Sequence, residues 1–383
     1  MTLPSIAHQY VVDDNLIALQ TYVVQNPTIL HSTNDNESMY PTTWHEGDNL
    51  LDFAAQHGNE ACFMYLSTLF PIDSVEDRLL MRAVYNTKYR QIIEVILQRQ
   101  PDHHVAEAVV QLAIRTNNLA AVQTLLPRCQ SWCFNTLLME AIQRSDNKIT
   151  HYLLQYFPDT SIDPQLLNPH RINAWFLAAQ CNAAILPKII SRFHGNENIA
   201  NAKGKHVYHF AVESSSVDSI MYLLTQPAIN KDYINKKGVT PLMYAIECAH
   251  EKATLALIQH GANLFIQDQR GKGLLHYAAE HNNLRCMQAA KEKLQLTTSC
   301  FLFWKSTSRQ TIGDLVQQKD LSGCTPLHLA AGKKNRELID FLLDHGADPQ
   351  AQNLFGTTPI QIATNHNHLE TVAQLTNAKT HKP

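Results

Sequence analysis

The chain has 383 residues, of which 45% are hydrophobic and 17% charged, so it carries enough apolar side chains for a buried core and does not have the composition of a disordered segment. Its net charge of −3 gives no reason to expect binding to nucleic acid or to an anionic membrane. The eight cysteines form no disulfide-like framework, and neither a signal peptide nor a long apolar span is apparent, so we expect a soluble cytoplasmic protein.

The N-terminal residues are predicted to form an atypical first helix pair. Residues 6–12 and 15–24 have the apolar spacing of two short helices, which end before Pro27 because proline cannot continue a helix. A polar stretch then runs to Gly47, and we expect it to form a long loop.

An alanine recurs through the whole chain and marks the first helix of each predicted pair. Successive markers lie between 28 and 52 residues apart, and the three shortest intervals, in the N-terminal half, leave no room for a projecting loop. Because a larger side chain would push closely packed helices apart, the series predicts about ten to eleven helix pairs. The markers are Ala7, Ala54, Ala83, Ala113, Ala141, Ala178, Ala211, Ala245, Ala278, Ala330 and Ala363.

A glycine repeats with the same phase in the C-terminal part of the chain. The intervals of 34, 33, 52 and 33 residues indicate a period of 33 with one insert of 19 residues, which we expect in a loop after a helix that ends near Leu294. In the best-defined copy, Thr325 is a good helix N-cap and Pro326 a good first helical residue. The glycines are Gly204, Gly238, Gly271, Gly323 and Gly356.

The stretch from Gly323 to Asp348, which contains GCTPLHLAA and LLDHGAD, resembles the ankyrin repeat, a unit of a turn, two antiparallel helices and a protruding loop. The resemblance implies an all-α ankyrin-repeat solenoid. Residues 1–160 would form degenerate short units, and residues 161–383 regular repeats with an insert at about 295–318. We expect one continuous, right-handed, curved stack, because repeats stack without gaps, although a separate N-terminal domain is an alternative.

The resemblance also implies a structural role for three histidines. His209, His276 and His328 occupy the motif position at which the family's histidine hydrogen-bonds the backbone of an adjacent turn. Met243 and Gln361 stand in that position in two other copies.

No motif in the sequence indicates catalysis. The chain lacks a nucleophile elbow and a phosphate-binding loop, and neither Cys129 with Cys133 nor His206 with His209 has a second ligand pair at zinc spacing. We therefore expect no enzyme activity, catalytic residue, metal or cofactor. The alternative is an enzyme whose active site lies in the N-terminal half and is carried to its target by the repeats.

The family's usual role implies a monomer that binds a protein partner, with its concave face and loop tips. The candidate residues in the repeats are Lys236, Lys237, Gln269, Arg270, Lys272, Leu321, Leu354 and Phe355. The insert adds the aromatic residues Phe301, Phe303 and Trp304, which either anchor the partner or pack on neighbouring helices.

Irregular ankyrin arrays rich in Asn, Gln and His resemble proteins that intracellular bacteria secrete into host cells. This resemblance implies a virulence effector that acts on a host protein in the host cytosol.

Overall fold

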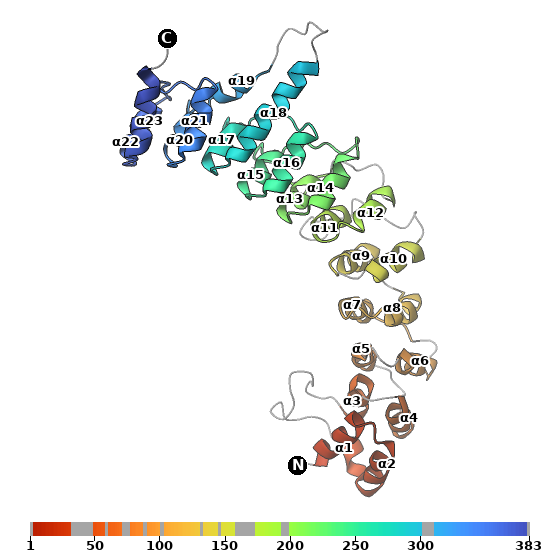
Figure 1. Cartoon of the computed structure of the whole chain (residues 1–383). Helices are drawn as coiled ribbons and strands as arrows, with labels where there is room; N and C mark the ends of the chain where they lie inside the picture. Colours follow the sequence, from red (N-terminus) through yellow and green to blue (C-terminus); the bar gives the residue numbers. More distant parts are fainter. Residues whose placement is uncertain are drawn as a thin grey trace. The chain divides into compact units, whose positions relative to one another are not determined.

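The computed structural model describes residues 3–31, 49–57, 60–70, 77–86, 90–99, 103–130, 133–144, 147–157, 173–192, 199–300 and 310–380. The chain divides into two compact units, Met1–Ile162 (unit 1) and Asp163–Pro383 (unit 2). The described residues are helical apart from turns, connecting segments and one isolated bridge between Ala200 and His206 (Figure 1). Continuous stacking from one unit to the other stays a prediction.

The described residues of unit 1 form five helix pairs, in each of which the first helix packs on the second. The first helices are α1 (Leu3–Val12), α3 (Leu50–His57), α5 (Asp77–Tyr85), α7 (Glu107–Arg115) and α9 (Phe134–Ile142). The second helices are α2 (Leu16–Gln25), α4 (Glu60–Leu69), α6 (Arg90–Arg99), α8 (Leu119–Leu125) and α10 (Asn147–Tyr156). Two short 3-10 helices follow α2 and α8, at Pro27–His31 and Leu126–Arg128.

Six further pairs and one additional short helix lie in the part of unit 2 that the structure describes. The first helices are α11 (Ala174–Cys181), α13 (Val207–Glu213), α15 (Pro241–Glu247), α17 (Leu274–Glu280), α20 (Pro326–Ala331) and α22 (Pro359–Asn365). The second helices are α12 (Leu186–Arg192), α14 (Val217–Leu224), α16 (Glu251–Gln259), α18 (Leu284–Cys300), α21 (Arg336–Asp344) and α23 (Leu369–Thr380). The additional helix, α19 (Ile312–Gln317), lies between α18 and α20 in the chain.

All eleven marker alanines lie in first helices, and each is at most 1% exposed. Within each unit, consecutive first helices pack against each other. The alanine methyl groups therefore lie where these helices approach closely, and the predicted all-α fold of about eleven helix pairs is confirmed.

Local sequence explains where the first helices of unit 2 begin. In α15, the Thr240 hydroxyl accepts a hydrogen bond from the Met243 amide at 3.2 Å, and Pro241 occupies the first helical position. In α22, the Gln361 side chain also accepts a bond from the Thr358 amide at 2.9 Å. These contacts satisfy amide groups that have no partner within the helix, so each helix starts at the Thr-Pro pair.

The insert differs from its prediction. Helix α18 does not end near Leu294 but continues to Cys300, and α19 forms a further helical segment before Gly323. The Thr311 hydroxyl accepts from the Asp314 amide at 3.3 Å, and the Asp314 carboxylate accepts from the Thr311 amide at 2.6 Å. This reciprocal cap starts α19, so the excess residues are partly helical and do not form a simple loop.

Candidate functional site

Five loops of unit 2 share one construction around the repeated glycine. Three residues before each glycine, an Asn or Asp side chain accepts two backbone N–H bonds; Asp268, for example, accepts from Arg270 and Lys272, both at 2.8 Å. The glycine itself has a positive φ, between 72° and 78° in all five loops. The acceptor side chains belong to Asn201, Asn235, Asp268, Asp320 and Asn353.

The tips of these loops are hydrogen-bonded to one another in a row. The Gln269 amide donates to the Lys237 carbonyl at 3.0 Å, and the Leu321 amide donates to the Arg270 carbonyl at 2.8 Å. Arg270 and Leu321 are joined in this way although the insert lies between them in the chain. We call the ten exposed tip residues the ledge. They are Ala202, Lys203, Lys236, Lys237, Gln269, Arg270, Leu321, Ser322, Leu354 and Phe355.

Glycine is required for this close approach of successive loops. A β-carbon on Gly238 would lie 2.7 Å from the Gln269 amide nitrogen, and one on Gly271 would lie 2.8 Å from that of Leu321. An L-residue would also have to adopt the left-handed backbone conformation that glycine tolerates. The repeated glycine therefore holds the ledge together, in addition to shaping each loop.

Three histidines connect a first helix to the loop of the next repeat. The Nδ1 atom of His209 accepts from the His206 amide at 3.2 Å, so the ring proton lies on Nε2, which donates to the Val239 carbonyl at 3.1 Å. His276 donates to the Cys324 carbonyl at 3.0 Å and His328 to the Thr357 carbonyl at 3.1 Å. The predicted structural role of these histidines is confirmed.

Burial keeps these rings neutral. It lowers the pKa of His209 to about 4, and the hydrogen bond to the Val239 carbonyl opposes the shift only in part. Burial also lowers the pKa of His276 and of His328. A neutral, fully hydrogen-bonded imidazole is suited to joining repeats and poorly placed to act as a base or metal ligand.

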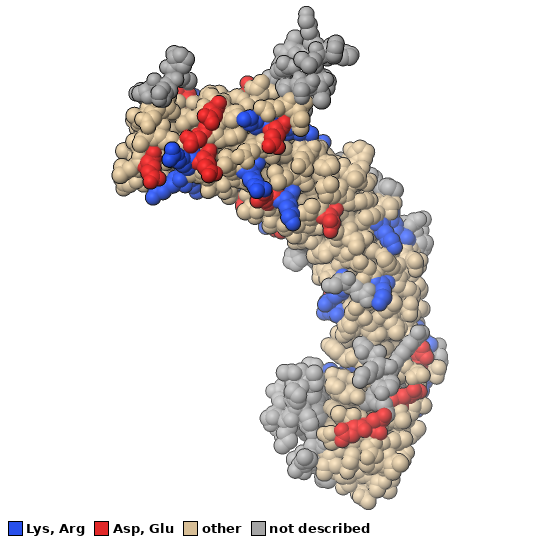
Figure 2. Space-filling view, in the orientation of Figure 1, with Lys and Arg blue, Asp and Glu red and all other residues tan. Residues whose placement is uncertain are grey.

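A groove of about 890 Å³ lies between the loops and the first helices of unit 2. Its lining comes from the loops around Gly204, Gly238 and Gly271 and from helices α15 and α17. Figure 2 shows Lys and Arg side chains beside Asp and Glu side chains on the visible face of unit 2. The lining includes Tyr244 and Glu247 from α15, together with Tyr277 and Glu280 from α17.

Two lysines in the groove are held by carboxylates at equivalent places in their repeats. The Lys205 ammonium lies 3.0 Å from a Glu213 carboxylate oxygen and 2.8 Å from the Tyr244 hydroxyl. The Lys272 ammonium lies 2.7 Å from a Glu280 carboxylate oxygen. Burial disfavours the charged form of Lys205, but these hydrogen bonds outweigh it and the pKa of Lys205 is raised.

The repeat between them lacks this pair. Val239 stands where its neighbours have Lys205 and Lys272, and Glu247, the counterpart of Glu280, forms no ion pair with any described residue. The Tyr277 hydroxyl donates to the Asp268 carboxylate at 2.9 Å, and burial together with this bond raises the pKa of Tyr277. The groove therefore contains neutral tyrosines and two lysines whose charges are balanced by Glu213 and Glu280. The carboxylate of Glu247 has no such counter-charge among the described residues and is available to a ligand.

The rim of the groove is cationic. Lys203, Lys236, Lys237 and Arg270 are exposed, and none of them forms an ion pair with another described residue. Water solvates these charges in the free protein, so they can contact an anionic partner without first breaking an ion pair.

The structure brings five of the residues predicted to bind a partner into this one groove, namely Lys236, Lys237, Gln269, Arg270 and Lys272. The predicted residues Leu321, Leu354 and Phe355 lie on the same ledge beyond the groove, with exposures of 70%, 75% and 81%. The candidates Phe301, Phe303 and Trp304 lie outside the described residues. Binding by all of these residues stays a prediction.

Sequence reasoning missed the residues that shape the site. It did not identify the acceptor Asn or Asp, although that residue stands three positions before each repeated glycine and was visible in the sequence. It also missed the contact between Lys205 and Tyr244, which are 39 residues apart and share no motif. Contacts between neighbouring loops and helices need the stacked structure to become apparent.

The described part of the chain holds no group of three or more His, Cys, Asp or Glu side chains arranged to bind a metal. Among the helices in the ranges given above, none is long and apolar enough to cross a membrane.

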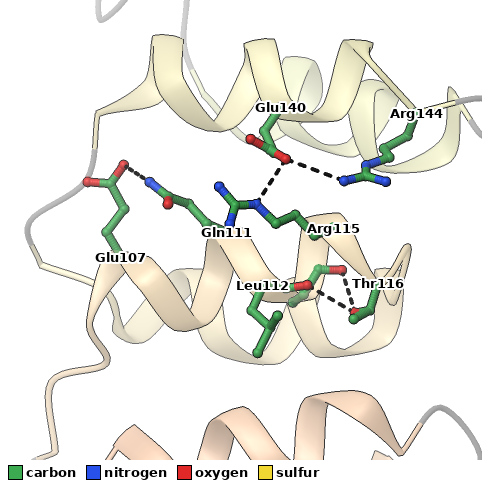
Figure 3. Close-up of polar contacts among 8 residues, drawn as sticks. Glu107, Gln111, Leu112, Arg115, Thr116, Glu140 and Arg144 are labelled. Carbon is green, nitrogen blue, oxygen red and sulfur yellow. Dashed lines mark hydrogen bonds and ion pairs between the residues drawn. The ribbon is translucent and has the colours of Figure 1, made fainter. Parts of the chain in front are cut away.

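Unit 1 has a different arrangement of polar side chains. Glu140 of α9 accepts a hydrogen bond from Arg115 of α7 at 3.0 Å and lies 3.4 Å from Arg144, two residues beyond the end of α9 (Figure 3). Glu107 accepts from Gln111 at 3.0 Å on the same face of α7. Arg115 is more than half exposed, so this ion pair contributes little to stability and its charge is partly available at the surface.

Comparison with known proteins agrees with this architecture. The family model "Ankyrin repeats (3 copies)" matches residues 175–268, 229–293, 255–353 and 275–382, all of which lie in unit 2 and together span just over half of the chain. The Arabidopsis thaliana protein XBAT31 is 29% identical over 175 residues, which cover 45% of this chain and 37% of that protein. The B-cell lymphoma 3 protein homolog of Mus musculus is 27% identical over 164 residues, which cover 42% of this chain and 32% of that protein.

The chain thus spans about a third of the length of these two relatives. Among solved structures, the ankyrin repeat domain of Bcl-3 is 21% identical with a TM-score of 0.49, covering 62% of this chain and 97% of that one. With the repeats matched from residue 175 to residue 382, and with the period, caps and stacked loops of the structure, the chain belongs to the ankyrin repeat family.

Proposed function

We propose that this chain is a protein-binding module that captures a partner protein in the groove and along the ledge of unit 2, and that it carries out no reaction itself. The observation that carries the proposal is the row of hydrogen-bonded loop tips with cations that have no ion-pair partner among the described residues. A row of loop tips held together by backbone hydrogen bonds suits recognition, because little backbone freedom is lost when a partner binds.

The chemistry inside the groove supports binding over catalysis. The imidazole of His276 is buried and donates its proton to the Cys324 carbonyl, and Lys272 is neutralised by Glu280. Both side chains are thus held in contacts within the repeats, which supports a binding role. The competing proposal places an active site in the first 160 residues. It would be supported by a reaction product that forms with the native chain and no longer forms when a residue of unit 1 is substituted.

Capture from a cell lysate tests the proposal. The full chain is compared with K236E/K237E/R270E, which reverses the rim, and with the control K188E/K252E/K333E, which makes the same charge change at exposed lysines away from the ledge. We expect the control to retain the proteins that the native chain captures and the rim variant to lose them. Equal capture by both variants would refute binding at this site.

The same experiment addresses the insert. A chain that lacks residues 301–309 removes the aromatic cluster without shortening α18. If Phe301, Phe303 and Trp304 anchor the partner, this chain captures less of it while its melting temperature stays unchanged. A large fall in melting temperature would instead assign these residues to the folded core.

The biological setting is part of the proposal. Under the effector hypothesis, the captured partner is a host protein and the chain acts in the host cytosol as an adaptor or a competitor. Capture from a eukaryotic lysate, with a bacterial lysate as the control, tests this hypothesis: selective enrichment of a protein from the bacterial lysate alone would contradict it.

A further inference from the structure

The chemical character of the ledge changes along its length. The loops around Gly204, Gly238 and Gly271 present Lys203, Lys236, Lys237 and Arg270. The loops around Gly323 and Gly356 present Leu321, Leu354 and Phe355, all at least 70% exposed. One half of the ledge is therefore cationic and the other half apolar.

The two halves form one continuous surface. The Leu321 amide donates to the Arg270 carbonyl at 2.8 Å at the junction, and the Leu354 amide donates to the Ser322 carbonyl at 2.9 Å within the apolar half. In the cationic half, the Lys236 amide donates to the Lys203 carbonyl at 3.2 Å. The 19-residue insert thus leaves the row of tips unbroken.

The apolar half is unusual for an exposed surface. Leu354 and Phe355 are adjacent in the chain and are 75% and 81% exposed, and Leu321 lies on the neighbouring loop. Large apolar side chains that gather on a surface mark interaction sites. Because this group adjoins a cationic group, a ligand that covers both must carry negative charge at one end and apolar side chains at the other.

We infer that the ledge recognises an extended segment of a partner protein that has an acidic half and an apolar half, and this inference rests on the proposed protein-binding function. The acidic residues contact Lys203, Lys236, Lys237 and Arg270. The apolar residues cover Leu321, Leu354 and Phe355.

The spacing of the loops sets the length of that segment. Packed helices lie about 8–10 Å apart, and an extended chain advances about 3.3 Å per residue, so about three residues of the partner cover one loop. Three cationic loops and two apolar loops then correspond to about nine acidic-half residues and about six apolar-half residues. A compact helix advances only about 1.5 Å per residue and would need about twice as many residues to cover the ledge.

Synthetic peptides of about 15 residues, sized by that spacing, test the inference with the full chain by fluorescence anisotropy. One peptide carries Glu at every third position of its first nine residues and Leu or Phe at every third position of the rest. The composition-matched control interleaves the acidic and apolar residues. We expect the two-part peptide to bind about tenfold or more tightly than the interleaved one, since only the two-part peptide satisfies both halves at once.

Variants locate the two contacts. K236E/K237E/R270E should weaken binding of the two-part peptide about tenfold or more and reverse its salt dependence, because added salt then screens a repulsion instead of an attraction. L354S/F355S should weaken binding to a similar extent, about tenfold, but leave the salt dependence intact. K188E/K252E/K333E should bind as the native chain does, and circular dichroism checks that each variant is folded.

Three results would overturn the inference. Equal binding of the interleaved peptide would show that the ledge does not distinguish separate acidic and apolar halves from a mixed sequence. Unchanged binding by L354S/F355S would remove the apolar half from the site. A native dimer in sedimentation that L354S/F355S converts to monomers would assign the apolar residues to a second copy of the chain. If lysate capture depends on the rim but the two-part peptide fails, the proposed function stands and only this inference fails.

Discussion

Units 1 and 2 use the same helix pair but join successive pairs differently. In unit 2, loops with a left-handed glycine are hydrogen-bonded tip to tip, and buried histidines donate to the next loop. In unit 1, α6 ends at Arg99 and α7 already begins at Glu107, and the residues between Arg128 and Phe134 are fewer still. These connections are shorter than those of unit 2 that carry the glycine loops, as the short alanine intervals predicted.

Unit 1 connects its repeats through asparagines. The Asn118 side chain donates to the Val84 carbonyl at the end of α5 at 3.1 Å, and Asn86 donates to the Ala55 carbonyl of α3 at 3.3 Å. The helix pair with its buried alanine is therefore common to both units, whereas the glycine loops and the histidine contacts that the structure describes lie in unit 2. The comparison assigns stacking to the alanines, whereas partner recognition by the loops is our proposal.

Enlarging a marker alanine should have the largest effect, and it should be equal in both units. We expect Ala113→Leu in unit 1 and Ala278→Leu in unit 2 each to lower the free energy of unfolding by about 3 kcal/mol, because both positions are fully buried between first helices. Urea denaturation followed by circular dichroism measures this. Ala61→Leu, on the exposed face of α4, is the control. A stable Ala113→Leu protein would show that the short repeats do not depend on their alanine.

Changing a ledge glycine should have the next largest effect. Gly238→Ala forces a left-handed alanine into contact with the Gln269 backbone, and we expect a loss of about 2–3 kcal/mol. Gly261→Ala has nearly the same φ but nothing within 4 Å of the new carbon, so it should lose only about 1 kcal/mol. Equal losses in the two variants would mean that the contact between successive loops adds nothing.

The histidines should make the stability of unit 2 depend on pH. The pKa of His209 is lowered to about 4 by burial, so in the folded chain it stays neutral while the unfolded chain takes up a proton below the ordinary value of 6.5. The free energy of unfolding therefore contains the full contribution of His209 above pH 6.5 and decreases as the pH falls. At pH 5 the loss due to His209 should be about 2 kcal/mol.

A matched variant isolates this effect. His209→Gln copies Gln361, which makes the same contact to the start of its own helix in the last repeat. Denaturation of this variant between pH 7.5 and pH 5 should show a smaller pH dependence than the native chain. A pH profile identical to that of the native chain would exclude His209 as the titrating group.

The asparagines of unit 1 should have the smallest effect. Asn118→Ala removes both the cap of α8 and the bond to the Val84 carbonyl, so we expect a loss of about 1–2 kcal/mol in denaturation. Asn15→Ala removes an exposed cap of α2 and should lose less, about 0.5–1 kcal/mol. If the losses were equal, the bond between repeats would contribute nothing beyond the cap.

The fold was predictable from the sequence wherever packing requires one residue type. The contact between consecutive first helices excludes large side chains, so the series from Ala7 to Ala363 identified every first helix described. These include the helices marked by Ala83, Ala113 and Ala141, where the repeated glycine is missing. The loop tips were predictable because the close approach of successive loops requires glycine at one position, which marks each tip in the sequence. Lys237 and Phe355 each directly precede such a glycine, and both are exposed on the ledge.

Other parts of the structure could be predicted only in part. The cap formed by Thr311 and Asp314 is a local pattern that could have indicated α19, whereas the extension of α18 to Cys300 runs through residues that favour helices only weakly. The groove was less accessible to prediction, because contacts such as that between Lys205 and Tyr244 join different repeats and depend on how the loops stack.

The most direct test of the account is hydrogen exchange of the full chain with and without the protein captured from lysate. The account predicts that the partner slows exchange in the loops of unit 2, at residues 201–205, 235–239 and 268–272, and leaves the helices of unit 1 unchanged. Protection that falls on α7 and α9 of unit 1, with unchanged exchange in the loops of unit 2, would contradict it.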